Sequence, residues 1–374
     1  MKRLALLPLF PLILLAASCG PSKPSKPRGQ TVVQQPQGPT REDFSPVDGQ
    51  ATADDIARFL AGRPVQHGAA LSQMQQTANY QEHAKDMAMK WRVFGSRRTG
   101  AQREFSETNL RPLTGSPQSL VYPFGGPDLL YATALFPQAS NYVLLGLEPP
   151  GGLPNLDNAD PGAVMGALNR LDTAMDAHLK TGYFITKDMK VHLSGGPLPG
   201  VTPILLASLS LMDARVDSVQ NISAAGRSGV EIQFRLPGGG SRRATYVSGD
   251  VSNGGFNSSF RGWLGSYSGG VAYFKAASYL MHDSGFSGIR EWVLGNCHAV
   301  VQDDSGIPYK YYDSSKWDIH LYGNYEGPIE LFAKHAQPDL RAAYDAAGGG
   351  PPLGFGSGYH FRPNEANLMI AVKK

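Results

Sequence analysis

The residues with the most reactive side chains gather in one short stretch near the C-terminus. Cys297 and His298 are adjacent, and Asp303 and Asp304 follow five to seven residues later. A thiol that loses its proton to a carboxylate-oriented imidazole is a nucleophile for hydrolysis. Neighbouring residues of a strand point to opposite faces, so Cys297 would need a partner other than His298. The stretch predicts either a hydrolase site with Cys297, His298 and Asp304, or a buried, inert cysteine.

The same stretch could instead bind a metal ion. Imidazole and carboxylate groups suit zinc or a similar cation, so His298, Asp303 and Asp304 are candidate ligands. The sequence contains no ligand motif such as HExxH. Asp303-Asp304-Ser305-Gly306 is also typical of a hairpin turn, because aspartate caps the local backbone and glycine accepts a positive φ. A turn without a metal is the alternative, and the sequence requires no cofactor.

A third candidate is a binding surface without catalysis. Aromatic side chains crowd the segment that follows, and we consider four of them as ligand-binding residues: Tyr309, Tyr311, Trp317 and Tyr322. Aromatic faces flanked by polar groups suit saccharide or protein partners. Packing in the core is the alternative use of the same side chains.

A βαβ unit over residues 119–148 is the clearest element that could position a site. An apolar strand precedes the Gly125-Gly126 turn, a helix follows the turn, and a second apolar strand ends at Glu148. This order of elements predicts two neighbouring parallel strands joined by a crossover helix.

The unit resembles the first half of a dinucleotide-binding (Rossmann) or class I methyltransferase domain. The resemblance implies cofactor contacts from Gly125, Gly126, Asp128 and Glu148. The third, spaced glycine of the fingerprint is absent, and Pro127 with Asp128 fits an ordinary helix start. The cofactor-binding interpretation therefore describes a degenerate domain of this type.

The N-terminus has the layout of a secretory signal. Lys2 and Arg3 precede an apolar segment that ends in small residues and Cys19. Residues 1–19 resemble the signal and lipobox of bacterial lipoproteins, which the type II signal peptidase processes. The resemblance implies cleavage after residue 18 and a diacylglycerol on Cys19. Gly20 in the next position implies the outer membrane, and we expect a lipid-anchored, periplasm-facing protein.

The net charge argues against a nucleic-acid partner, and the cysteine content argues against a disulfide within the chain. The formal net charge is +3, and residues 1–45 contribute +4, so residues 46–374 carry about −1. A near-neutral body argues against nucleic acid as a partner. With Cys19 lipidated, Cys297 is the only other cysteine, and no disulfide can form within the chain.

Composition divides the chain into three parts. Residues 1–18 are the signal, and residues 19–45 form a Pro- and Gln-rich tether without enough apolar residues to fold. We expect one α/β domain over 46–374, with a mostly parallel central sheet flanked by helices and an antiparallel C-terminal extension. The leading functional interpretation is a binding or envelope-maintenance module with an envelope glycan or protein partner. The rival is a hydrolase, and the sequence indicates no oligomeric state.

Local patterns predict several elements of this domain. Helical spacing predicts a helix from Asp160 to Gly182, and alternation predicts a hairpin over 230–251. The apolar run at 203–212 is expected to contain a strand, and 271–282 is expected to be helical.

Overall fold

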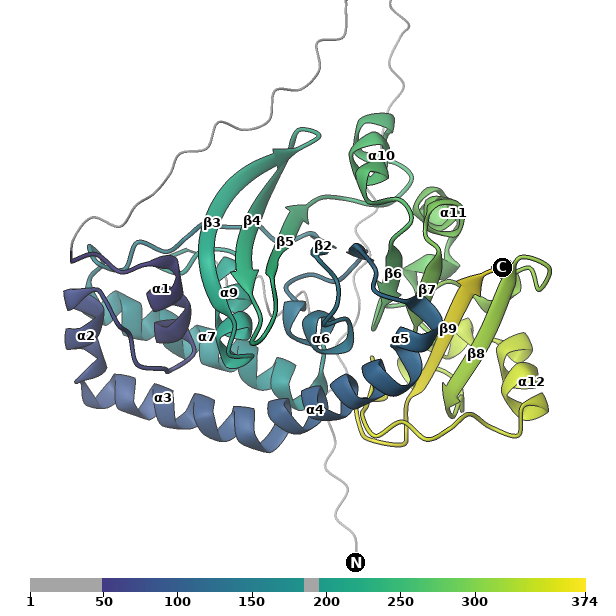
Figure 1. The fold of residues 1–374 in the computed structure, drawn as a ribbon, viewed down its shortest axis with the longest axis horizontal. Helices are drawn as coiled ribbons and strands as arrows, with labels where there is room; N and C mark the ends of the chain where they lie inside the picture. Colours follow the sequence, from purple (N-terminus) through teal and green to yellow (C-terminus); the bar gives the residue numbers. More distant parts are fainter. Residues whose placement is uncertain (1–48, 185–194) are drawn as a thin grey trace, which may run out of the picture. The chain divides into compact units, whose positions relative to one another are not determined.

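A nine-stranded mixed sheet forms the centre of the fold (Figure 1). The computed structural model describes residues 49–184 and 195–374. The expected signal, the lipid site at Cys19 and the tether therefore lie outside the described residues. In spatial order the strands are β3 (Arg215–Ala224), β4 (Arg227–Arg235), β5 (Ser241–Ser248), β2 (Asn141–Gly146), β1 (Ser119–Tyr122), β6 (Val271–Phe274), β7 (Ala299–Gln302), β9 (Asn367–Lys373) and β8 (Trp317–Gly323).

Parallel pairing is confined to the middle of the sheet. Strands β5, β2, β1, β6 and β7 are parallel neighbours. Antiparallel strands extend both edges, with β4 and β3 beyond β5, and β9 and β8 beyond β7. The prediction of a mixed α/β fold is confirmed, as is the antiparallel C-terminal extension. The description as mostly parallel holds only for these five strands, because four of the eight pairings are antiparallel.

Helices lie against both faces of the sheet (Figure 1). Their bounds are α1 (Ala53–Leu60), α2 (Ala69–Gln75), α3 (Ala78–Lys90), α4 (Ser96–Phe105), α5 (Arg111–Thr114), α6 (Leu129–Leu135), α7 (Pro161–Thr181), α9 (Thr202–Leu211), α10 (Ser258–Leu264), α11 (Ser287–Asn296) and α12 (Pro338–Ala346). Two π-helical turns, Trp91–Gly95 and Ser106–Leu110, join α3, α4 and α5 into one long band. No helix in the described residues is both long and apolar enough to cross a membrane.

Alternation along the strands creates one hydrophobic core on each face. Leu120 and Leu144 face the core that contains α6, α7 and α9. Val121 and Val143 face the core that contains α10 and α11. Strands buried on both faces are typical of a parallel sheet covered by helices.

Several local predictions are confirmed. Strand β1, helix α6 and strand β2 form the βαβ unit with parallel pairing. Helix α7 follows the expected bounds, because the Asp160 side chain accepts a hydrogen bond from the amide of Ala163 and Gly182 ends the helix at φ 85°. Strands β4 and β5 form the expected antiparallel hairpin.

Two local predictions are wrong. The run over 203–212 belongs to helix α9, which is buried on every side and so shows no helical periodicity in its apolar residues. Residues 271–274 form strand β6 rather than the start of a helix. Four consecutive buried residues fit a short central strand as well as a helix, and pairing with β1 and β7 decides between them.

Candidate functional site

The carboxyl ends of β1 and β6 mark the point where the order of the parallel strands reverses. From β1 the chain passes to β2 and β5 on one side, then returns to β6 and β7 on the other. In open α/β sheets, ligands bind outside the carboxyl ends of the strands at such a switch point. A ligand site of this sheet is therefore expected at the carboxyl ends of β1 and β6.

A fully buried charged cluster lies at the switch point. The carboxylate of Asp128, just after β1, forms a close ion pair with the ammonium of Lys275, the first residue after β6. Its other oxygen lies 3.3 Å from Nε2 of His178 on α7, and the Tyr122 hydroxyl donates to Oδ2 over 2.9 Å. The exposed fractions of the Asp128, Lys275 and His178 side chains are 3%, 2% and 0%. We call Asp128, Lys275, His178 and Tyr122 the switch-point cluster.

Burial and charge set the protonation of this cluster. Burial opposes ionisation of Asp128, but Lys275 outweighs it and holds the pKa of the carboxyl below its usual value. Burial lowers the pKa of His178, so its ring is neutral at neutral pH. Arg98 and Lys275 both lie over the Tyr131 ring, 5.4 and 4.4 Å from its centroid. Two cations thus lie over one aromatic ring beside the cluster.

The cluster makes fewer hydrogen bonds than its polar atoms allow. Nδ1 of His178 has no hydrogen-bond partner among the described residues, and the only polar partner there of Nζ of Lys275 and Nε2 of His178 is the Asp128 carboxylate. Native proteins leave few buried polar groups unsatisfied, and such groups often mark a bound water, ion or ligand. Unsatisfied donors at a switch point therefore indicate a ligand site.

Strained backbone lies beside the cluster. Ala276, Ser278 and Tyr279, directly after β6, have φ values of 52°, 53° and 61°. Each left-handed residue that is not glycine costs about 1 kcal/mol or more, and such strain concentrates at functional sites. This segment is held by the turn after β7: Ala276 N–H donates to Asp303 Oδ2 over 2.9 Å, and the Tyr279 hydroxyl donates to Asp304 Oδ2 over 2.7 Å.

Asp303 and Asp304 are fully engaged by protein donors. Ser305 donates its amide and hydroxyl to Asp303 Oδ1, and Asn367 Nδ2 donates to Asp304 Oδ1 over 3.1 Å. Burial, reinforced by the charge of Asp304, raises the pKa of Asp303 to about 6. The two residues lock the strained segment in place.

The pKa of Asp303 predicts a pH-dependent stability. An acid whose pKa rises on folding binds its proton more tightly in the folded state, so its stabilising effect is complete below the unfolded pKa near 4. It is lost as the pH rises through about 6. At about 1.4 kcal/mol per pKa unit, the free energy of unfolding should fall by up to about 3 kcal/mol from this group. Urea unfolding between pH 4 and 7 measures the slope. Asp303→Asn should flatten it, and an equal slope in this variant would contradict the assignment.

The residues singled out for cofactor binding meet at this edge but are occupied. Glu148 is buried; its Oε2 lies 3.3 Å from the Tyr246 hydroxyl and accepts the amide of Leu147 over 3.2 Å. Asp128 caps α6, a helix of only seven residues, and places a carboxylate where a pyrophosphate would need to bind. Gly125 and Gly126 form a tight turn in which the Asp128 amide donates to Gly125 O over 3.1 Å. The geometry does not suit a dinucleotide.

The structure does not assemble the site predicted around Cys297. Cys297 and His298 precede β7, whereas Asp303 and Asp304 follow it, so they lie at opposite ends of the strand. Burial raises the pKa of the Cys297 thiol to about 12. The His298 ring nitrogens lie 2.7 and 3.1 Å from backbone carbonyl oxygens of Gly269 and Thr114. The predicted metal ligands His298, Asp303 and Asp304 are separated in the same way, and no group of three potential ligands occurs among the described residues.

A thiol reagent tests the placement of Cys297. Because the residue is 0% exposed among apolar side chains, we expect 5,5′-dithiobis(2-nitrobenzoate) to modify it only after urea unfolds the chain. The Cys297→Ala variant accounts for any label on Cys19. Rapid stoichiometric labelling of Cys297 in the folded protein at pH 8 would contradict the buried placement.

The four aromatic residues proposed as a binding surface are dispersed. Trp317 packs into the core beneath α10 and α11, whereas Tyr322 lies against the opposite core. They are five positions apart on β8, so their side chains point to opposite faces. Tyr311 is 38% exposed and packs under the Arg290 guanidinium, and Tyr309 is partly buried. They do not form one surface.

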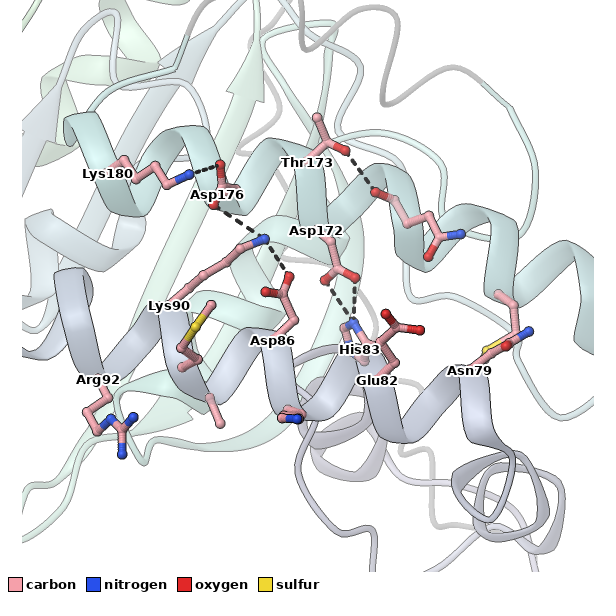
Figure 2. Close-up of a pocket in the computed structure, with 15 residues that line it drawn as sticks. Asn79, Glu82, His83, Asp86, Lys90, Arg92, Asp172, Thr173, Asp176 and Lys180 are labelled. Atoms are coloured by element: carbon pink, nitrogen blue, oxygen red, sulfur yellow. Dashed lines mark hydrogen bonds and ion pairs between the residues drawn. The ribbon is translucent and has the colours of Figure 1, made fainter.

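A groove between α3 and α7 is a second candidate site, which the sequence analysis missed (Figure 2). Its volume is about 1270 Å³, and both of its walls carry charged side chains. The signal in the sequence is the pattern Asn-x2-acid-x3-Asp-x3-Lys, which occurs at residues 79–90 and again at 169–180. Each helix directs this polar stripe along one wall.

Comparisons with known proteins identify no relative. No protein family matches the chain, and neither a curated protein nor a solved structure matches it.

Proposed function

We propose that this chain is a lipid-anchored protein of the bacterial envelope, held in the outer membrane by acylated Cys19 and facing the periplasm. The small residues before Cys19 resemble a lipidation site and support the anchor. Two or three acyl chains at that residue would hold the protein on a membrane durably. The composition of residues 19–45 supports a flexible tether, which would separate the domain from the lipid surface.

Metabolic labelling tests the anchor. Cells that express the full-length chain are fed an alkyne analogue of palmitate, and the chain is purified and coupled to a fluorescent azide. We expect label on the wild type and on Cys297→Ser, and none on Cys19→Ser. Unlabelled wild type, or a labelled Cys19→Ser variant, would contradict anchoring at Cys19.

We further propose that the domain binds a small carboxylate at the switch-point cluster. The observation that carries this proposal is the incomplete hydrogen bonding of the Lys275 and His178 side chains at a strained switch point, where Asp128 is their only polar partner among the described residues. A carboxylate would accept the free N–H donors of the Lys275 ammonium. Its negative charge would be attracted by Lys275 and Arg98, which both lie over the Tyr131 ring.

Thermal unfolding in the presence of lactate tests this ligand class. A ligand that binds only the folded state raises the free energy of unfolding, by about 2.7 kcal/mol at 100 times Kd, and the melting temperature rises with it. We expect lactate to raise the melting temperature more than chloride at equal ionic strength. The Lys275→Met/Asp128→Asn variant should show only the chloride response. Equal responses to both salts in the wild type would contradict the proposal.

A second candidate is a methyltransferase-like domain, favoured by one observation. Numbered along the chain, β5, β2, β1, β6, β7, β9 and β8 follow the order 3-2-1-4-5-7-6, with the last strand antiparallel between its neighbours. This order resembles that of class I methyltransferases, to which the βαβ unit was compared. Calorimetric titration with S-adenosylmethionine separates the candidates: saturable binding weakened by Glu148→Gln supports this one, and absence of binding excludes it.

A further inference from the structure

The helical band of α3 and α4 presents one solvent-facing surface of mixed basic and apolar side chains. Lys85, Met89, Val93 and Arg97 follow one another at steps of four residues, and Arg92 is adjacent to Val93. All five residues are exposed. The band runs along one side of the domain (Figure 1), and Arg92 points away from α7 (Figure 2). We call these five residues the basic face.

A π-helical turn over Trp91–Gly95 aligns this face. Steps of four residues drift around an α-helix of about 3.6 residues per turn, and the wider π turn counteracts the drift. Trp91 and Phe94 pack against the core. A Cβ on residue 95 would lie 2.3 Å from the Trp91 ring, so the ring packs there only over glycine. Such turns are frequent at functional sites, and this one leaves Arg92 and Val93 in solvent.

The sequence of the band supplies cations without acids at this face. Residues 87–103 contain no aspartate or glutamate, and their cations are Lys90, Arg92, Arg97, Arg98 and Arg103. The acid that precedes this stretch, Asp86, is paired with Lys90. The nearest exposed acids along the band are Glu82 and Glu104, which lie beyond the two ends of the basic face. The basic face therefore has a net positive charge.

The cations of the basic face are available to a partner. None of the three forms an ion pair with any described residue. Two other cations of the band turn inward instead: Lys90 binds carboxylates of α3 and α7, and Arg98 donates to carbonyl oxygens at the end of α7. The apolar members of the face, Met89 and Val93, are 45% and 37% exposed. Exposed cations interleaved with exposed apolar side chains are typical of helices that lie on a membrane surface.

We propose, building on the lipid anchor proposed at Cys19, that the basic face binds the surface of an anionic phospholipid bilayer. Each lysine or arginine close to such a surface strengthens the attraction about fivefold. Met89 and Val93 would enter the boundary between head groups and acyl chains, where exposed apolar side chains leave water. Three cations bind a free protein only weakly. The anchor would hold the domain beside the bilayer, so that docking becomes intramolecular and a weak affinity suffices.

A fluorophore beside the face tests the inference in the lipid-anchored full-length chain, purified from cells and reconstituted into vesicles. In a Cys297→Ala background, a polarity-sensitive dye is attached to Ala88→Cys, an exposed position next to Met89. We expect emission at least about twofold stronger with phosphatidylglycerol in phosphatidylcholine vesicles than with phosphatidylcholine alone, and loss of the difference at high ionic strength. The same dye on Glu291→Cys, exposed on α11 over the opposite core, should respond equally to both vesicles.

Two charge-reversal variants locate the docking surface. Arg92→Glu/Arg97→Glu should lower the response of the dye at residue 88 at least about fivefold. Lys310→Glu/Lys334→Glu makes the same change in net charge at two exposed lysines elsewhere and should leave the response unchanged. Thermal unfolding confirms that each variant is folded. Equal losses in the two variants would overturn the proposal.

Flotation of the vesicles separates the docking from the anchor. A chain that floats with both kinds of vesicle, while the dye at residue 88 gives the same emission in both, would overturn the docking alone. A chain that floats with neither would overturn the anchor and the docking together. We expect flotation with both and a response only to phosphatidylglycerol.

Discussion

Lys275→Met is expected to lower the free energy of unfolding by about 3 to 5 kcal/mol. Methionine preserves most of the volume of the side chain, so the loss arises from charge rather than from a cavity. The Asp128 carboxylate would remain buried without its ion-pair partner, and the remaining donors, Tyr122 and the ring of His178, cannot offset its desolvation. Urea unfolding followed by tryptophan fluorescence measures the change.

Two controls isolate the ion pair in that experiment. Adding Asp128→Asn to Lys275→Met removes the unpaired charge and should restore part of the lost stability. Lys334→Met, at an exposed lysine without an ion pair among the described residues, should change stability by less than about 0.5 kcal/mol. A loss below about 1 kcal/mol for Lys275→Met would show that the ammonium is hydrated rather than buried in the cluster.

Arg98→Ala should cost about 2 to 3 kcal/mol. Its guanidinium joins three parts of the chain: Nη1 donates to Leu179 O over 2.7 Å, and Nη2 donates to Lys180 O and Phe361 O over 2.9 and 3.2 Å. Two of these carbonyl groups belong to the last turn of α7, where a positive charge also interacts favourably with the helix dipole. Nη1 further donates to the Tyr131 hydroxyl over 3.0 Å.

The neighbouring arginine is the control for this variant. Arg97 is exposed on the same helix, so Arg97→Ala removes an equal side chain and should cost less than about 0.5 kcal/mol. Both variants are compared with the wild type by urea unfolding. Equal losses would mean that removing any arginine side chain from α4 lowers stability, and that the contacts of Arg98 with the end of α7 contribute nothing specific.

Elements with a strong local signal were predictable from the sequence. The Asp160 cap and the Gly182 stop bound α7, and alternation over 230–236 identified β4. The βαβ unit combined two apolar strands with a glycine turn. Helix α9 was not recognisable, because a segment buried on all sides has no polar face to reveal its period.

The candidate site was only partly predictable. Asp128 was identified from its place after β1, but its partners were not, because lysine and histidine are ordinarily exposed and nothing local marks Lys275 or His178 as buried. The Cys297-His298 pair was conspicuous in the sequence, and a four-residue strand separates it from Asp303 in the structure. The sequence interpretation placed these residues in one site because they are close along the chain. Strand β7 lies between them, so they are at opposite ends of that strand.

The most direct test of the central claim is a crystal structure of the full-length chain grown with lactate. The proposed function predicts a carboxylate within hydrogen-bond distance of Lys275 Nζ, in addition to the Asp128 contact, with the ligand beside the ring of His178. A refined site in which protein atoms alone complete the hydrogen bonds of Lys275, with lactate absent from the switch point, would contradict it.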